Sequence, residues 1–251
     1  LHDALPISDK MRMKRILFSL ICICLFSLQS LAQNIYLVSV GIADYPGTEN
    51  DLTLPAKDAE TIQWIYQKNQ KAETILLIDA QATRSNVLSS MTRIFNKASA
   101  KDIIVLFFSG HGYKGGFVGY DAMITYQDIK KTMAKSAAKN KMIFADACFS
   151  GKMREPRRNS SNISPSSLKV MLFLSSRENE VSIESPSMKN GFFTTCLQRG
   201  LRGGADVNRD RIITAKELFE FVSQGVKKLS RDKQHPVMWG KFSDSMPVMI
   251  W

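Results

Sequence analysis

Short apolar runs alternate with amphipathic or polar stretches along most of the chain, and few folds suit such a pattern. The runs cover residues 35–42, 74–79, 102–109, 141–147 and 170–175. The third run, DIIVLFFS, is apolar on both faces of a strand. The stretches between and after the runs predict helices over residues 56–69, 85–98, 126–138, 193–201 and 215–229. Strands that are apolar on both faces and separated by helices predict a mainly parallel α/β sheet covered on both sides.

The end of the chain adds two short runs, at residues 236–240 and 247–251, which predict strands that complete the edge of the sheet. The 251 residues, 44% of them apolar, suit one globular domain with a real core. We therefore expect a single domain over residues 33–251.

Residues 1–32 have the layout of a secretory signal peptide. A basic segment precedes a short apolar run at 16–28, and Ser30 and Ala32 supply small residues before Gln33. The run is too short to span a bilayer comfortably, so we expect cleavage and export to the periplasm, the surface or the medium. A retained N-terminal anchor is the alternative. Residues 1–9 fit no part of a signal peptide and are interpreted as non-native.

The charge and the cysteines exclude several classes of protein. Residues 1–32 hold four Lys/Arg and two Asp/Glu, so the rest has 30 basic and 21 acidic side chains, a net charge of +9. These charges are scattered and no nucleic-acid-binding motif is present, so we expect no nucleic-acid partner. Only Cys148 and Cys196 lie outside the predicted signal peptide, which excludes a disulfide framework. Cys196 is expected in the core, and Cys148 needs another explanation.

A histidine and a cysteine, each in a glycine-containing motif, follow two of the predicted strands. The run at 102–109 leads into His111, within SGHG, and the run at 141–147 leads into Cys148, within DACFSG. In parallel sheets the carboxyl ends of the strands form the ligand site. A lone cysteine is usually a buried apolar residue, and a lone histidine an ordinary strand end. Together at one edge they predict a thiol activated by an imidazole. Backbone N–H groups of Gly112, Ser150 and Gly151 are candidates for holding an oxyanion.

The segments FFSGHG at 107–112 and DACFSG at 146–151 resemble the two active-site motifs of caspase-like cysteine peptidases. The metacaspase and bacterial caspase-like branch, with its Asp-x-Cys-x-Ser-Gly motif, is the most similar. The resemblance covers about residues 34–251 and includes Asp58-Ala59 and a helix opening at Gly191. It implies a three-layer α-β-α sandwich with a six-stranded, mainly parallel sheet. It also implies an endopeptidase with His111 as general base, Cys148 as nucleophile, and no cofactor for the chemistry.

The same resemblance implies protein or peptide substrates with a basic P1 residue. Asp146 matches the acid that helps to bind P1 Arg or Lys. The alternative is that it only ties down the turn before Cys148. A second acid is expected from Asp44 or Asp51, while Ser175 and Ser176 are expected to edge the substrate groove. The animal-caspase pattern Gln-Ala-Cys-x-Gly is not found, which argues against cleavage after Asp. The basic, Ser-rich residues 152–167 predict an exposed loop, which is either a self-cleavage site or an uncut connection.

Residues 206–217 resemble an EF-hand calcium loop. Oxygen ligands stand at positions 1, 3, 5, 9 and 12, and a backbone carbonyl at position 7, which gives the set Asp206, Asn208, Asp210, Thr214, Glu217 and Ile212. Arg211 replaces the usual glycine at position 6, so it must adopt a positive φ. The expectation is a weak structural Ca²⁺ site. The alternative is a degenerate loop held by its own turn hydrogen bonds.

Two other function classes compete with the peptidase. A non-catalytic, caspase-shaped binding or regulatory module would keep the fold, but it has no need of both His111 and Cys148. A calcium-dependent structural or surface protein would depend on Asp206 and not on Cys148. The sequence favours the peptidase.

Overall fold

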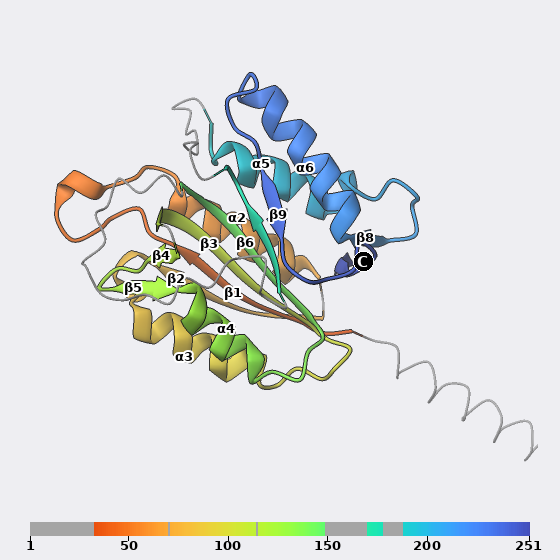
Figure 1. Ribbon diagram of the computed structural model, residues 1–251, viewed down its shortest axis with the longest axis horizontal. Helices are drawn as coiled ribbons and strands as arrows, with labels where there is room; N and C mark the ends of the chain where they lie inside the picture. The colour runs from red at the N-terminus through yellow and green to blue at the C-terminus, as the bar shows by residue number, and fades with distance from the viewer. Residues whose placement is uncertain (1–32, 70, 114, 149–169, 178–187) are drawn as a thin grey trace, which may run out of the picture. The chain divides into compact units, whose positions relative to one another are not determined.

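Six strands form the path of the central sheet (Figure 1). They are β1 (Ile35–Gly41), β2 (Ala72–Ile78), β3 (Ile103–Tyr113), β6 (Asn140–Cys148), β7 (Met171–Leu174) and β9 (Val237–Trp239). Their order is β2-β1-β3-β6-β7-β9, and neighbours are parallel except for the antiparallel pair of β7 and β9. The predicted α/β sandwich with a mainly parallel sheet is confirmed.

The computed structural model describes residues 33–69, 71–113, 115–148, 170–177 and 188–251. The chain divides into residues 1–33 and 34–251, and every described helix and strand belongs to the second unit. The predicted signal peptide at 1–32 and the predicted loop at 152–167 lie outside the described residues. None of the described helices has the length and apolar character needed to cross a membrane.

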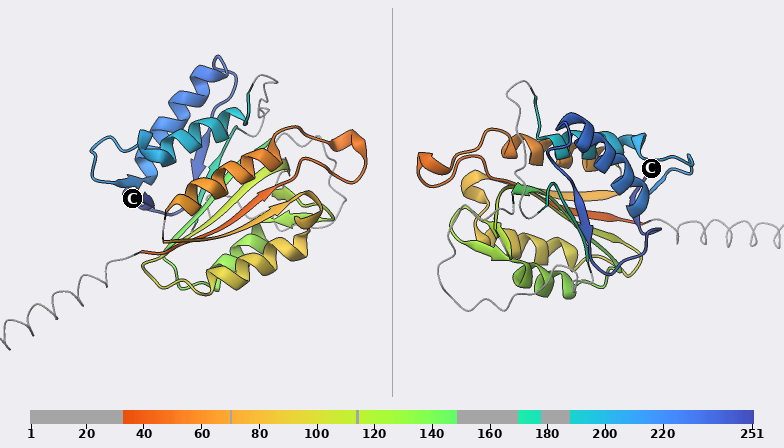
Figure 2. Two further views of the ribbon diagram at one scale, coloured as in Figure 1. Left: turned by 180° about the vertical axis from the view of Figure 1, so that it is seen from behind. Right: turned by 45° about the horizontal axis from the view of Figure 1, so that its top comes forward.

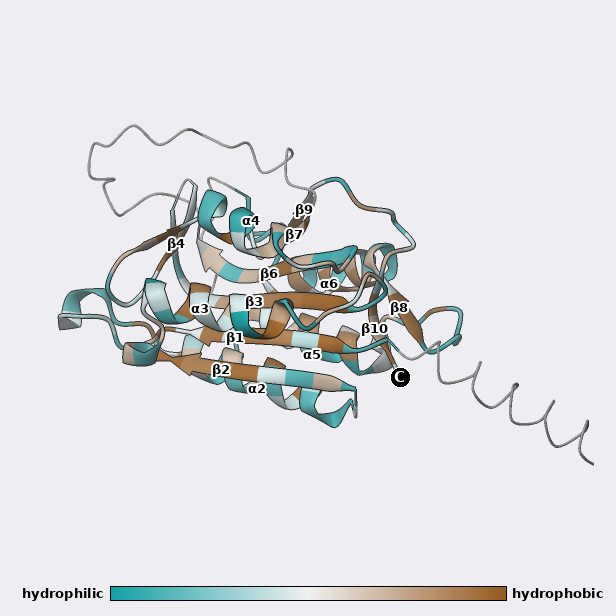
Figure 3. Ribbon diagram, turned by 90° about the horizontal axis from the view of Figure 1, so that it is seen from below, coloured by the Kyte–Doolittle hydropathy of each residue, from teal (hydrophilic) through white to brown (hydrophobic). Residues whose placement is uncertain are grey.

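Helices cover both faces of the sheet (Figures 1 and 2). On one face lie α3 (Arg84–Phe95) and α4 (Tyr126–Ala134), and on the other lie α2 (Pro55–Lys68), α5 (Phe192–Arg199) and α6 (Ala215–Leu229). Alternate side chains of β3 enter the two cores, because successive residues of a strand point to opposite faces. Figure 3 shows β1 and β3 as largely apolar, as the sequence pattern requires.

A short hairpin extends the far end of β3. Its strands are β4 (Gly116–Val118) and β5 (Met123–Thr125), and β4 pairs antiparallel with the end of β3. The apolar pattern did not predict this hairpin, because three-residue strands are too short to give a period. The remaining short elements are the 3₁₀ turns η1 (Thr48–Asn50) and η2 (Asp79–Gln81) and the π-helical turn η4 (Gly200–Gly204).

The end of the chain corrects one prediction. The run at 236–240 forms β9 and completes the sheet edge, as expected. The run at 247–251 forms β10 (Pro247–Ile250), which instead pairs antiparallel with β8 (Ile212–Thr214) in a separate two-stranded sheet. This pairing buries Val248 and Met249 in the core shared with α6. The apolar side chains therefore lie against α6 and not at the edge of the main sheet.

Phe173 of β7 is the centre of the core beneath α5 and α6. Its side chain is fully buried. Its ring centroid lies 4.9 Å from that of Phe193, 5.5 Å from that of Phe219 and 6.2 Å from that of Phe144. One ring thus links the sheet to both helices that cover this face.

We expect Phe173→Ala to lower the free energy of unfolding by about 3–5 kcal/mol, because it removes a buried ring and leaves a cavity. Urea unfolding measures the change. Val207→Ala is the control: this side chain is 78% exposed, so a change within about 0.5 kcal/mol is expected. Equal effects of the two substitutions would contradict the packing described for this face.

Candidate active site

The pairing of β3 with β6 brings the two predicted catalytic residues together. The strands are parallel neighbours, and the register sets Ser109 opposite Asp146 and His111 opposite Cys148. Cα atoms of partners in adjacent strands lie about 4.8 Å apart. Cys148 is the last residue of β6 and His111 lies two residues before the end of β3, so both are at the carboxyl edge of the sheet, as the sequence predicts.

The imidazole of His111 is partly buried and held by the segment between β1 and α2. Its Nε2 lies 2.8 Å from the carbonyl oxygen of Asn50. A carbonyl only accepts hydrogen bonds, so Nε2 carries the proton, and in the neutral ring Nδ1 is the basic nitrogen. The ring of Tyr45 packs against the imidazole with centroids 4.9 Å apart. Neither Asn50 nor Tyr45 was predicted from the sequence, because no sequence pattern marks a backbone carbonyl or a ring contact.

Two buried carboxylates lie at the same edge. Asp146 of β6 is 7% exposed, and Asp58 of α2 is 2% exposed. Asp146 Oδ2 accepts hydrogen bonds from the backbone N–H (3.1 Å) and the hydroxyl (2.8 Å) of Thr194. Asp58 accepts from Ser109 Oγ (2.9 Å), Asn190 Nδ2 (2.8 Å) and Gly191 N (3.1 Å). These hydrogen bonds fix the two carboxylates.

Gly191 shows how closely the carboxylates approach each other. A Cβ added there would lie 2.5 Å from Asp146 Oδ2 and 3.4 Å from Asp58 Oδ2, so a larger residue would collide with Asp146. Burial, and then the charge of Asp146, raise the pKa of Asp58 well above its usual value, against the lowering effect of its hydrogen bonds. Such a pair favours either a bound proton or a cation nearby.

The structure places Asp58 beside Asp146, and not the two acids suggested from the sequence. Asp44 is exposed, with its backbone N–H bonded to Asp79 Oδ1. Asp51 is exposed and accepts the backbone N–H of Tyr45 at 3.1 Å. A signal for Asp58 was available, because it precedes Ile62 by one helical turn and so falls on the buried face of its helix. A carboxylate on the buried face of a helix is energetically costly, so it indicates a hydrogen-bonded or functional role.

The remaining predicted site residues have different surroundings. Ser175 and Ser176 are inaccessible to solvent, and the Ser175 hydroxyl bonds to both the N–H and the carbonyl of Ala147 at 3.2 Å. Ser175 therefore supports the strand end before Cys148 instead of edging an open groove. Gly112 is partly exposed and pairs with Phe117 of β4. Ser150 and Gly151 lie outside the described residues.

We expect Asp146→Asn to change how stability depends on pH. Because the pKa of Asp58 is higher in the folded chain than in the unfolded chain, the folded protein holds the carboxyl proton more tightly. Protonated Asp58 therefore adds to the free energy of unfolding. This contribution is complete below about pH 4 and is lost as the pH rises through the raised pKa. Without the neighbouring charge this loss shrinks, while an amide oxygen still accepts from Thr194. Urea unfolding between pH 4 and pH 8 measures the difference between variant and wild type.

Asp44→Asn is the matched control for this test, because the same change is made at an exposed side chain. Its stability curve is expected to run parallel to that of the wild type. If the Asp146→Asn curve also runs parallel, the two carboxylates do not interact as described.

The predicted calcium loop, residues 206–217, follows η4 and includes β8 and the first turn of α6. The first three of its predicted ligand side chains accept backbone N–H groups within the loop: Asp206 from Arg211 (3.1 Å), Asn208 from Asp210 (2.9 Å) and Asp210 from Ile212 (2.8 Å). Thr214 caps α6, and the carboxylate of Glu217 bonds back to Thr214. The loop therefore has the form of a helix-flanked turn closed by a capping box.

Two observations bear on whether this loop suits a cation. Arg211 has φ of 68°, as expected for a residue in place of the glycine, and Asp206 Oδ1 is a buried oxygen without a hydrogen-bond partner. Against this, the described residues contain no group of three or more His, Cys, Asp or Glu side chains able to hold a metal ion. Calcium binding at this loop stays a prediction.

We expect calcium to raise the melting temperature. With a Kd of about 1 mM, typical of weak extracellular sites, 10 mM calcium stabilises by about 1.4 kcal/mol, or roughly 3–6 °C. Differential scanning fluorimetry measures the shift, and Asp206→Asn should remove it. No shift in the wild type, or the same shift in the variant, would mean that the loop is held by its own hydrogen bonds.

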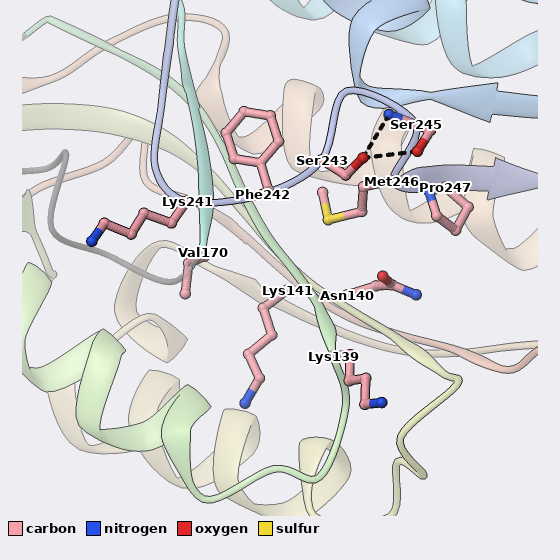
Figure 4. Close-up of a pocket in the computed structure, with 10 residues that line it drawn as sticks. All are labelled: Lys139, Asn140, Lys141, Val170, Lys241, Phe242, Ser243, Ser245, Met246 and Pro247. Carbon is pink, nitrogen blue, oxygen red and sulfur yellow. Dashed lines mark hydrogen bonds between the residues drawn. The ribbon is translucent and has the colours of Figure 1, made fainter.

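A hollow of about 260 Å³ lies at the opposite, amino end of β6 (Figure 4). The lysine side chains around it do not converge in Figure 4. The Lys141 ammonium donates hydrogen bonds to the carbonyl oxygens of Met133 (2.6 Å) and Ser136 (2.8 Å). The hollow therefore has no part in the arrangement around His111.

Comparisons with known proteins agree with the geometry. The family model described as "Caspase domain" matches residues 36–246. Among solved structures, protein GSU0716 from Geobacter sulfurreducens superposes with a TM-score of 0.65 at 15% identity, covering 86% of this chain and 97% of that one. At this identity the likeness concerns the fold alone. A comparison with curated proteins finds no match.

Proposed function

Because the chain belongs to the caspase family of cysteine peptidases, we propose that it hydrolyses peptide bonds with Cys148 as nucleophile and His111 as general base. The observation that carries the proposal is the register of β3 and β6, which pairs these two residues at the carboxyl edge of the sheet. Family membership makes proteins or peptides the substrates.

The proposed reaction uses the protonation of the imidazole. Nδ1 of His111 accepts the thiol proton, and the Cys148 thiolate attacks the carbonyl carbon of the scissile bond. The imidazolium then protonates the leaving amine as the C–N bond breaks. A water molecule hydrolyses the acyl-enzyme and returns the thiol. The carbonyl of Asn50, 2.8 Å from Nε2, supports this assignment by holding the other ring proton. Backbone N–H groups of Gly112, Ser150 and Gly151 are the proposed oxyanion donors.

We propose that the pair of Asp58 and Asp146 selects Arg or Lys at P1. A guanidinium or ammonium group between two carboxylates forms charge-assisted hydrogen bonds. The raised pKa of Asp58 supports this assignment, because an arriving cation would compensate the charge that burial and Asp146 disfavour. Substrate binding would then release a proton from Asp58.

Export and self-cleavage belong to the same proposal and are supported by the sequence alone. Residues 1–32 would direct export, and residues 152–167, with Lys152, Arg154, Arg157 and Arg158, would offer the enzyme basic cleavage sites of its own.

Fluorogenic peptides with Arg, Lys or Asp at P1 test the proposal. We expect cleavage after Arg and Lys, and complete loss of it in Cys148→Ala. Asp146→Asn should lower kcat/KM for P1 Arg by roughly 30-fold or more, since it removes one partner of a buried charge pair. Asp44→Asn, an exposed acid, should leave kcat/KM unchanged.

Other outcomes separate the parts of the proposal. Cleavage after Asp would overturn the assignment of the carboxylate pair and keep the mechanism. No cleavage by folded protein with an intact Cys148 thiol would favour the non-catalytic binding module.

A further inference from the structure

Tyr45 is the most closely engaged neighbour of His111 and comes from a different part of the chain. It lies in the connection between β1 and α2, and its side chain is 4% exposed. Its ring meets the imidazole at 44°, with centroids 4.9 Å apart. A buried aromatic ring in contact with the imidazole restricts the tilt of that ring.

The hydroxyl of Tyr45 makes two hydrogen bonds at the end of β3. It accepts the backbone N–H of His111 at 2.9 Å and donates to the carbonyl oxygen of Val118 at 3.2 Å. Burial raises the pKa of Tyr45, so the hydroxyl keeps its proton and can donate. The hydroxyl therefore fixes the backbone of His111 relative to β4.

Gly110 makes this approach possible. Its φ is +150°, and a Cβ there would lie only 2.7 Å from the Tyr45 hydroxyl oxygen. The glycine before His111 therefore accommodates the tyrosine. This requirement is separate from any need for space on the substrate side.

The segment that carries Tyr45 also supplies the Asn50 carbonyl. The backbone N–H of Tyr45 donates to Asp51 Oδ1 at 3.1 Å, and that of Leu52 donates to the carbonyl of Ala43 at 2.8 Å. These bonds close the segment into a loop. The loop contacts His111 at three places: the backbone N–H, the ring face and Nε2.

We propose that Tyr45 is a positioning residue for His111, which sets both the backbone and the ring plane of the general base. This inference rests on the proposed function, since it assigns Tyr45 a role in the same reaction. In this proposal Tyr45 takes no part in the proton or acyl transfers and acts through its contacts with the backbone and ring of His111. Its loss should therefore lower the rate of the chemical step more than the affinity for the substrate.

Tyr45→Phe keeps the ring and removes the hydroxyl. We expect kcat for a P1 Arg peptide to fall about 10- to 100-fold, because small displacements of a catalytic group are costly, with KM within about twofold. Tyr126→Phe is the matched control. Tyr126 is buried on the same face of the sheet, and its hydroxyl has no hydrogen-bond partner, so kcat and KM should stay unchanged.

Alkylation of Cys148 by iodoacetamide, followed by peptide mass spectrometry on the full chain, provides a test without a peptide substrate. Thiol reactivity depends on the thiolate fraction, which a positioned imidazole increases. At pH 7 we expect His111→Ala and Tyr45→Phe to slow labelling, and Tyr126→Phe to leave it unchanged. Melting temperatures identify any variant that fails to fold.

The two measurements distinguish the outcomes. Slower labelling in Tyr45→Phe supports the positioning role even if no tested peptide is cleaved. Labelling that depends on His111 but is unchanged in Tyr45→Phe, with kcat also unchanged, overturns it. Labelling that is unaffected by His111→Ala rejects the proposed dyad, and the role of Tyr45 with it.

Discussion

The parallel pairing of β3 with β6 is the interaction on which the rest of the structure depends. Both strands are buried over most of their length, at residues 103–110 of β3 and 142–147 of β6, so neither can slip by one residue without moving apolar side chains to the wrong core. The register that satisfies the two cores also sets His111 opposite Cys148. The pairing of the two backbone positions of the proposed dyad is thus a consequence of core packing.

At the same edge of the sheet, two buried carboxylates reduce the stability of the fold. Asp58 and Asp146 are buried next to each other, and the raised pKa of Asp58 reflects that cost. Donors from two separate segments, Ser109 of β3 and residues 190–194 at the start of α5, hold the carboxylates in place. A core built for stability alone would place apolar residues here. The proposed binding of a cationic P1 side chain would offset this cost.

Loops from outside the sheet complete the arrangement around His111. The segment that contains Tyr45 and Asn50 contacts the backbone N–H, the ring and Nε2 of His111. Because the Asn50 carbonyl accepts the Nε2 proton, Nδ1 is left as the basic nitrogen. Gly110 and Gly191 each leave space for one such contact, at the Tyr45 hydroxyl and at the Asp146 carboxylate. Glycines at this edge therefore serve close approach between segments as much as backbone freedom.

The sequence by itself determined the strands of the main sheet, its two covered faces, and the convergence of His111 and Cys148. Apolar periodicity predicts the strands and helices from the local pattern. Because ligand sites of parallel sheets lie at the carboxyl ends of the strands, the direction of the chain then brings His111 and Cys148 to one edge. Only the tertiary structure decided that Asp58 is the partner of Asp146, that Tyr45 holds His111, and that β10 pairs with β8. These contacts join segments far apart in the chain. Side-chain contacts of this kind carry no periodic signal, so they exist only once helices and loops have packed on the sheet.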